Sequence, residues 1–181
     1  MSLFPEKING KYAIVLSVNT DAPPTRIAVA YFDREEQMWS PTYWEGWYSL
    51  LNDSVIPLQR SSKDHVEVGA PPIKTKYGWL LIYSYIQSYF SPPAVFGIEA
   101  VLLDLHDPRR IIARAEAPLM VPQEDYEKYG KVPNIVFPTG AMVKDGTLYL
   151  YYGAADTTCA VATCKLDTLL EDILKTNHYL K

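Results

Sequence analysis

A repeat with a period of 68 residues is the sequence feature that most constrains how this chain can fold. Three segments combine a turn with an apolar, tyrosine-rich run: "NGKYAIVLSV", "YGWLLIYSYI" and "DGTLYLYYGA". Their glycines, Gly10, Gly78 and Gly146, are 68 residues apart both times. Self-similarity at a fixed period indicates one supersecondary unit repeated in space. The chain is therefore expected to build the same structural unit three times.

A second apolar run follows each segment and completes a pattern typical of antiparallel strands. The runs are Arg26 to Asp33, Gly97 to Leu105 and Cys159 to Asp167. β-Branched and aromatic residues favour strands, and the 14 prolines indicate many turns. Three successive strands form a meander, and a fourth completes a propeller blade. We therefore expect an all-β fold, a partial β-propeller of about three blades, in a single domain of residues 1–181.

The predicted repeat units cover approximately residues 1–60, 61–130 and 131–181. Closed propellers typically use four to eight blades, so three units leave open edges that something must cover. The cover could be a second copy, as a homo-oligomer, or a missing N-terminal half. The only convincing helical signal lies in the tail, where Thr168-x-x-Glu171 has the pattern of a capping box that opens a short C-terminal helix.

Charge and hydropathy exclude several classes of partner. The net charge is −4 and the 17 basic residues are scattered, which argues against nucleic acid, because neutralising phosphates needs a basic patch. No apolar run approaches the roughly 18 residues of a membrane span. Three histidines far apart in sequence make a metal site improbable. Without a visible signal peptide, and with Cys159 and Cys164 facing opposite sides of a strand, a cytoplasmic location is the expectation.

Three longer segments carry a family resemblance: "VEVGAPPIKTKYGWLLIY", "AVLLDLHDPRRIIARAEAPLMVP" and "VPNIVFPTGAMVKDGTLYLYYGAAD". Together with "FPEKINGKY" they resemble glycoside hydrolase family 130, the β-mannoside phosphorylases, over nearly the whole chain. The resemblance implies a five-bladed β-propeller of roughly twice this length, of which the chain is the C-terminal half. It also implies action on mannose-containing oligosaccharides, mostly β-linked, with inversion. Most members use inorganic phosphate as nucleophile, and some use water.

The resemblance assigns a substrate-binding role to the end of the "YYGAAD" motif. Asp156 corresponds to an acid that contacts the sugar at the cleavage subsite, with Tyr152 and Gly153 beside it. Small residues at Gly153, Ala154 and Ala155 are expected to let the sugar approach the backbone. Without the resemblance, Asp156 would simply be a turn residue. The family's proton donor is an Asp of the N-terminal half, and no residue here can be assigned that role.

Two positions that help to hold phosphate in the family differ in this chain. His65 stands where the phosphorylases have a Lys, and Ser84 stands where they have a His. Glu67 replaces a Gly beside them, and a carboxylate there repels phosphate. Inverting hydrolysis needs a carboxylate base, for which Glu67 is the first candidate and Glu99 the second. Hydrolysis is therefore slightly favoured over phosphorolysis, although phosphate stays a candidate co-substrate; no other cofactor is expected.

Each of these candidates has a plainer alternative. Glu67 and Glu99 could be solvated strand carboxylates, and Lys74 of "PPIKT", which also matches a family position, could be an ordinary surface lysine. The aromatic segment "MWSPTYWEGWYSL" could be a sugar-stacking platform or a hydrophobic plug at a blade edge. At the level of the whole chain, the alternative to a mannoside-processing glycosidase is a catalytically incomplete fragment, or a carbohydrate-binding propeller module that lacks the general acid.

Overall fold

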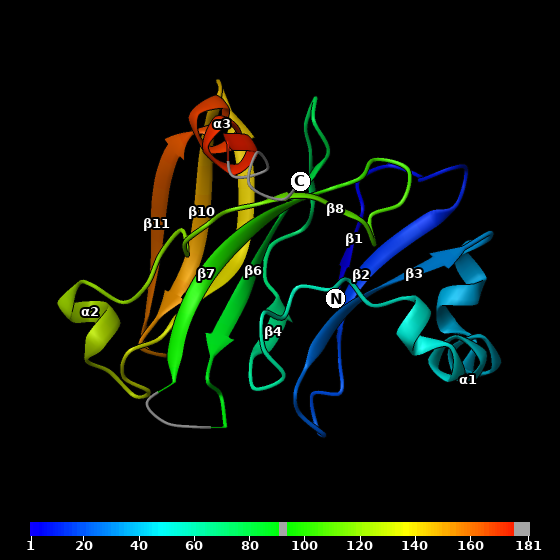
Figure 1. Cartoon of the computed structure of the whole chain (residues 1–181), viewed down its shortest axis with the longest axis horizontal. Helices are drawn as coiled ribbons and strands as arrows, with labels where there is room; N and C mark the ends of the chain where they lie inside the picture. Colours follow the sequence, from blue (N-terminus) through cyan, green and yellow to red (C-terminus); the bar gives the residue numbers. More distant parts are fainter. Residues whose placement is uncertain (91–93, 176–181) are drawn as a thin grey trace.

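The computed structural model describes residues 1–90 and 94–175 and consists mostly of antiparallel β-sheet with a few short helices (Figure 1). The first sheet contains β1 (Ser2–Leu3), β2 (Tyr12–Val18) and β3 (Arg26–Phe32). The second contains β4 (His65–Val68), β5 (Ile73–Lys74), β6 (Trp79–Gln87), β7 (Val95–Leu103) and β8 (Ile111–Arg114). The third contains β9 (Val136–Lys144), β10 (Thr147–Ala154) and β11 (Thr158–Lys165).

Each predicted repeat unit contributes one sheet, in which consecutive strands pair as a meander, except that β4 and β5 of the second sheet both pair with β6. The repeated glycines have identifiable backbone roles. Gly10 and Gly146 lie in turns with φ of +81° and +70°, a conformation that other residues rarely adopt. At Gly78 a Cβ atom would lie 2.4 Å from the Leu103 carbonyl oxygen. The three repeated glycines therefore occupy positions that favour glycine, two because of their positive φ and one because a Cβ atom has no space.

The three sheets are stacked in the order in which they occur along the chain. Val15 and Val29 of the first sheet pack against Trp79, Leu81 and Tyr83 of β6. The other face of β6 packs against the third sheet through a separate core, whose members include Leu80, Ile82, Leu102, Leu148 and Leu150. Because successive side chains of a strand point to opposite faces, β6 is buried on both sides. This explains its almost continuous apolar sequence.

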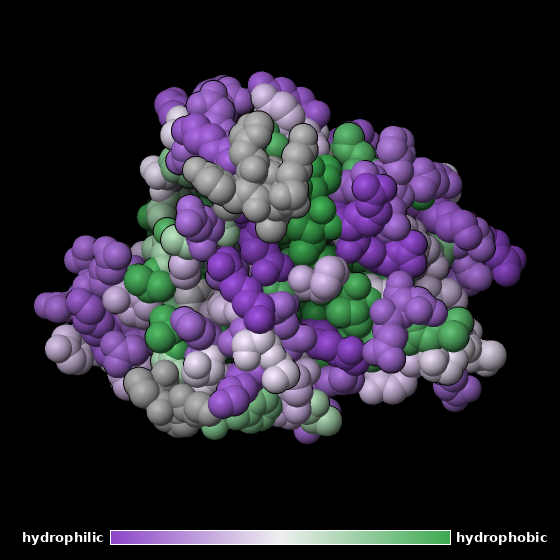
Figure 2. Space-filling view, in the orientation of Figure 1, coloured by the Kyte–Doolittle hydropathy of each residue, from purple (hydrophilic) through white to green (hydrophobic). Residues whose placement is uncertain are grey.

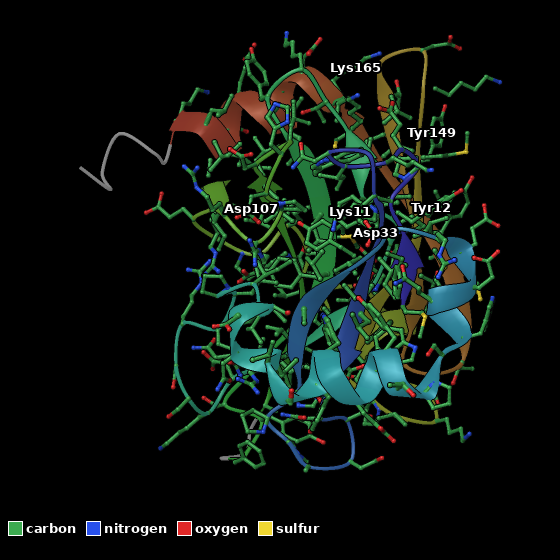
Figure 3. The ribbon with its side chains drawn as sticks, turned by 90° about the vertical axis from the view of Figure 1, so that its right-hand side faces the viewer. Lys11, Tyr12, Asp33, Asp107, Tyr149 and Lys165 are labelled. Carbon is green, nitrogen blue, oxygen red and sulfur yellow. The ribbon has the colours of Figure 1, made fainter. Side chains whose placement is uncertain are left out.

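Helix α1 (Pro41–Ser49) covers the outer face of the first sheet, as Figure 3 shows from the α1 side. Short 3-10 helices flank it: Glu35–Trp39 and Leu51–Asp53. The sequence indicated a helix only in the tail, and α1 shows that this expectation is wrong. Ser40 caps α1 by accepting a hydrogen bond from Tyr43 N–H at 3.3 Å, and Pro41 occupies the first turn.

Tyr43, Trp44 and Trp47 of α1 pack onto the first sheet as a plug would, whereas Tyr48 is 58% exposed. Trp44 and Trp47 pack at an interplanar angle of 83°, and both contribute to the core above the first sheet. Their indole N–H groups donate to the carbonyls of Met38 and Val29, over 2.9 and 3.2 Å. The helix is thus stabilised mainly by tertiary packing, which a single-sequence pattern does not display.

Helix α3 (Leu166–Lys175) confirms the predicted C-terminal helix, with a different start. It follows β11 directly, so Thr168 lies inside the helix and the predicted capping box is wrong. Leu166 N–H instead donates to the Gly146 carbonyl at 3.0 Å, which anchors the first turn to the neighbouring hairpin. Leu170 and Ile173 are buried against the core between the second and third sheets.

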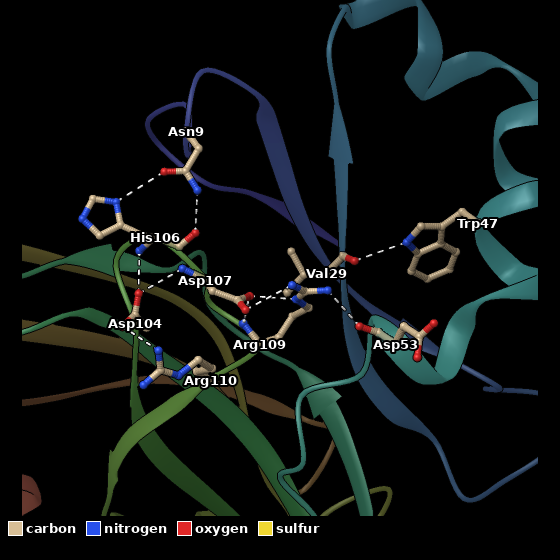
Figure 4. Close-up of polar contacts among 9 residues, drawn as sticks. All are labelled: Asn9, Val29, Trp47, Asp53, Asp104, His106, Asp107, Arg109 and Arg110. Carbon is tan, nitrogen blue, oxygen red and sulfur yellow. Dashed lines mark hydrogen bonds and ion pairs between the residues drawn. The ribbon is translucent and has the colours of Figure 1, made fainter.

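A polar cluster connects the first sheet to the loop between β7 and β8 (Figure 4). Asn9 donates to the His106 carbonyl at 2.8 Å, and Arg109 donates to the Asp53 carbonyl at 3.0 Å. Asp107 accepts two hydrogen bonds from the Arg109 guanidinium, at 2.7 and 3.1 Å. The Arg109 side chain lowers the pKa of Asp107, and the backbone N–H groups of Asp107 and His106 lower the pKa of Asp104.

The exterior is mixed in character. Most of the face shown in Figure 2 is hydrophilic, with small hydrophobic areas between polar ones. Within residues 1–90 and 94–175, no helix is long and apolar enough to cross a membrane.

Candidate functional site

A cavity of about 420 Å³ brings together residues of the second and third sheets and of the segment between them. Two carboxylates border it: Glu67 from β4 and Asp156 from the turn between β10 and β11. Tyr89, Phe96 and Phe137 supply aromatic walls. A cavity with aromatic faces and a few carboxylates is suited to a polyhydroxylated ligand, because rings cover its apolar faces and carboxylates accept bonds from its hydroxyls.

Asp156 lies at the tip of a tight hairpin. Ala155 and Asp156 have φ of +46° and +51°, and Thr157 N–H donates to the Ala154 carbonyl at 3.0 Å. Two residues with positive φ match the twist of a hairpin, and Asp tolerates this conformation. The Asp156 side chain is 56% exposed and lies 3.6 Å from the Lys131 ammonium. The hairpin therefore presents a carboxylate that is accessible at the rim of the cavity.

Gly153 also borders the cavity, and a Cβ atom placed on it would meet nothing within 4 Å. Ala154 and Ala155, in contrast, are fully buried, and Ala155 N–H donates to the Ile135 carbonyl at 2.9 Å. The expectation that all three small residues give room to a ligand is therefore wrong for the two alanines. Alternation along β10 turns the Ala154 side chain away from the cavity and into the core.

Tyr152 points away from the cavity, to the buried face of β10. Its hydroxyl donates to Glu127 Oε1 at 2.8 Å and lies 3.1 Å from the Tyr126 hydroxyl. Burial, with these two partners, raises the pKa of Tyr152. Glu127 belongs to α2 (Asp125–Lys128), and no sequence pattern pointed to it. The structure thus places Tyr152 in a packing network, separate from Asp156.

Glu67 is held by a histidine that the fold buries beneath it. His65 Nε2 lies 2.6 Å from Glu67 Oε1, and His65 Nδ1 accepts the backbone N–H of Thr25 at 3.2 Å. The Tyr89 ring stacks on the imidazole, with centroids 4.3 Å apart and an interplanar angle of 21°. The His65 side chain is 4% exposed and that of Glu67 is 33% exposed. Only the carboxylate of this pair is therefore presented to a ligand.

Ser84 pairs with Glu67 across β4 and β6, and its side chain is buried. Among the described residues its hydroxyl has no hydrogen-bond partner. Lys74 lies on β5, where its ammonium pairs with Glu6 at the surface. The structure therefore places Ser84 next to Glu67 and does not bring Lys74 to the cavity.

Glu99 lies on the opposite face of the second sheet, because it pairs with Tyr83 rather than with Ser84. Its carboxylate accepts the Tyr83 hydroxyl at 2.8 Å and an Arg60 N–H at 3.3 Å. Burial, with the nearby Glu99 charge, raises the pKa of Tyr83. Glu99 borders a different cavity, of about 350 Å³, together with Arg60 and Asp64. The two carboxylates considered as base are thus separated by the sheet.

No group of three or more potential metal ligands occurs within residues 1–90 and 94–175.

Comparison with known proteins identifies the family. Residues 1–175 match the model of glycoside hydrolase family 130, described as beta-1,4-mannooligosaccharide phosphorylase. The chain belongs to this family. It is 41% identical over 165 residues to a 1,2-beta-oligomannan phosphorylase of Thermoanaerobacter sp. (strain X514), covering 91% of this chain and 50% of the relative. The chain spans about half the length of the curated relatives it matches.

Solved family structures share the fold. A beta-1,2-mannobiose phosphorylase from Listeria innocua, in complex with beta-1,2-mannobiose, has a TM-score of 0.73 and 30% identity over 95% of this chain and 45% of that one. A second structure, with a TM-score of 0.64 and 23% identity, covers 90% of this chain and 45% of that one. That structure is described in connection with glycoside hydrolases of the family that target beta-1,2 mannosidic linkages in Candida mannan. The stack of three sheets is therefore part of the family 130 fold.

Proposed function

We propose that this chain is the C-terminal, sugar-binding half of an inverting enzyme that acts on β-mannosides. In this proposal its three sheets are blades of a five-bladed propeller, and a mannose-containing oligosaccharide occupies the cavity between Glu67 and Asp156. Two features support it. The relatives are named for β-mannoside substrates, and the cavity combines two carboxylates with three aromatic rings.

We further propose hydrolysis rather than phosphorolysis, and one observation carries this choice. The 2.6 Å contact between His65 Nε2 and Glu67 Oε1 engages the one ring nitrogen of His65 that Thr25 leaves free. A phosphate entering here would meet the Glu67 carboxylate, and repulsion between like charges opposes its binding. The buried Ser84 carries no charge to offset this repulsion. The relatives named as phosphorylases make this a divergence within the family.

In this proposal the chain supplies the general base and the residues that contact the sugar. In inverting hydrolysis one carboxylate removes a proton from water while an acid on the opposite side protonates the leaving oxygen. Glu67 is the proposed base, and Asp156 accepts hydrogen bonds from sugar hydroxyls. The family resemblance assigns the acid to the N-terminal half. The chain by itself is therefore expected to bind the sugar, and turnover is expected only with that half present.

The first test is sugar binding by the chain itself, measured by isothermal titration calorimetry with β-1,2-mannobiose. We expect Asp156→Asn to weaken binding about tenfold, since a hydrogen bond to a charged group contributes about 1.5–3 kcal/mol. The matched control is Asp145→Asn, at the opposite hairpin of the same sheet, where φ is also positive at +49°. Equal affinity of Asp156→Asn and the unaltered chain would remove Asp156 from the site.

The second test distinguishes the two reactions. With the N-terminal half supplied, β-1,2-mannobiose is incubated with and without inorganic phosphate, and the products are separated by anion-exchange chromatography. Hydrolysis predicts free mannose under both conditions and no mannose 1-phosphate. Phosphate-dependent formation of mannose 1-phosphate would overturn the assignment. Sugar binding without turnover in either condition would favour a carbohydrate-binding module.

A further inference from the structure

We propose that His65 is a positioning residue that fixes the orientation of the Glu67 carboxylate through one defined tautomer. The proposal rests on the role suggested above for Glu67 as base. It rests structurally on a continuous series of contacts from the first sheet to the cavity: Thr25 to His65, and His65 to Glu67.

The tautomer follows from the direction of the first hydrogen bond. A backbone N–H can only donate, so the 3.2 Å contact from Thr25 requires a lone pair on His65 Nδ1. In a neutral imidazole the proton is then on Nε2. Nε2–H therefore donates to Glu67 Oε1 at 2.6 Å, a charge-assisted bond of the stronger kind. One carboxylate oxygen is fixed in this way, and the other is left to contact substrate or water.

The surroundings of the imidazole prevent it from turning. Thr25 is fully buried, and its carbonyl accepts the backbone N–H of Val66 at 3.2 Å, so Thr25 is bonded both to the ring of His65 and to the backbone of the next residue. The stacked Tyr89 ring covers one face of His65. Rotation of the imidazole would break the bonds to Thr25 and Glu67 while leaving both groups in place. Because His65 already fixes the orientation of Glu67, the proposed base loses less conformational freedom when the substrate binds. Residues that do not touch the substrate can support a site in this way.

The cavity wall thus gains rigidity from a sheet that does not border it. Thr25 comes directly before β3 of the first sheet, while Asp156 is on the third. Glu67 in the second sheet is therefore oriented by its neighbour on one side and faces the ligand on the other. The hydrogen bond to Glu67 occupies the Nε2–H group of His65, which is the donor that an anion bound in the cavity would need. We expect the residue at position 65 to influence which nucleophile the site accepts, although His65 touches no substrate.

The direct test is ¹⁵N NMR of the histidine ring in the full chain at neutral pH. The proposal predicts a protonated, pyrrole-like Nε2 and an unprotonated, pyridine-like Nδ1 for His65, with Nε2 shifting in Glu67→Gln. His106, which lies outside this series of contacts, serves as the internal control. A protonated Nδ1, or two tautomers in exchange, would overturn the proposal whether or not the chain binds sugar.

Two substitutions separate positioning from simple packing. His65→Gln keeps an N–H donor near Glu67, whereas His65→Phe keeps the ring shape and removes the donor. His65→Phe also loses the acceptor for Thr25 N–H, for which the Gln carbonyl oxygen is an imperfect substitute, so the melting temperatures of both variants are measured beside their affinities. Affinity for β-1,2-mannobiose should stay within about threefold in His65→Gln and fall about tenfold in His65→Phe, the loss expected when a charged group loses its partner.

The outcomes are distinguishable from a failure of the proposed function. Equal affinity of the two variants would show that His65 only fills space. If the unaltered chain binds no mannobiose at all, the proposed function fails, and the ring-nitrogen measurement still decides whether the tautomer is fixed.

Discussion

Glu127 illustrates what a single buried carboxylate contributes. It accepts the backbone N–H groups of Gln123 and Glu124 at 2.7 and 3.0 Å, besides the Tyr152 hydroxyl. Burial raises the pKa of Glu127, but these three hydrogen bonds outweigh burial and leave the pKa lowered. Glu127 is the buried residue of the short helix α2, and together with the Tyr126–Tyr152 contact it joins the segment from 123 to 128 to β10.

We expect Glu127→Gln to lower the free energy of unfolding by about 1–3 kcal/mol at pH 7, since an amide cannot accept all three bonds and leaves a buried donor unsatisfied. Denaturant titration measures this. The exposed Glu116→Gln is the control and should change stability little. The ionised Glu127 contributes stability that is present above the pKa of Glu127 in the unfolded chain. The loss of unfolding free energy caused by Glu127→Gln should therefore shrink as the pH falls through the lowered pKa of folded Glu127.

At the residue level, a sequence motif named several side chains whose functional roles stay predictions, and the structure shows where they lie. Glu67, Gly153 and Asp156 do border one cavity. Prediction from the sequence could not find Thr25, because Thr25 contributes a backbone N–H that any residue except proline would offer. Nor could it place Glu99, whose face of the sheet depends on its register with Tyr83.

At the scale of elements, helix α1 is the longest helix that the sequence pattern did not predict. Its sequence, "PTYWEGWYS", contains a glycine and β-favouring aromatics and therefore has weak helical propensity. The strands were easier, because Tyr, Val, Ile and Leu alternate between faces that are buried in successive cores. Propensity and period predict an element that can form locally, whereas α1 depends on the sheet beneath it.

Trp44→Ala tests that dependence. Removing the indole leaves a cavity between α1 and Phe32, and we expect a loss of about 3 kcal/mol in the free energy of unfolding. Thermal denaturation followed by near-ultraviolet circular dichroism measures it. Trp39→Ala is the matched control, because Trp39 is 83% exposed and belongs to the same aromatic segment. Similar losses in both variants would contradict a plug.

At the scale of the whole molecule, polar contacts hold the first two sheets together at one end of their shared core. Asp104 and Asp107 both have pKa values lowered by hydrogen bonds within the loop that joins β7 to β8. A carboxylate with a lowered folded pKa contributes stability that is present above its unfolded pKa and lost as the pH falls through its folded pKa. Acid should therefore weaken the contact between the sheets.

We expect Asp107→Asn to lower the melting temperature at pH 7. The difference from the unaltered chain should begin to diminish below about pH 4, the ordinary pKa of an unfolded Asp, and disappear as the pH falls through the lowered pKa of folded Asp107. Scanning calorimetry across pH measures both. Asp33→Asn is the control, because the Asp33–Lys11 ion pair is at the surface (Figure 3), where such pairs contribute little. A difference that is constant with pH would contradict this account.

The position of α1 gives the stack of sheets a direction. One terminal face is closed by the helix, whereas the opposite face, formed by the third sheet, exposes Met142, Tyr151 and Val161. The two ends of the stack are therefore unlike: a blade added beside the first sheet must pack on α1 or displace it, whereas a blade added beside the third sheet meets exposed apolar side chains. In the proposed five-bladed ring, the N-terminal half would thus form two different junctions with this chain, one against a helix and one against a bare sheet.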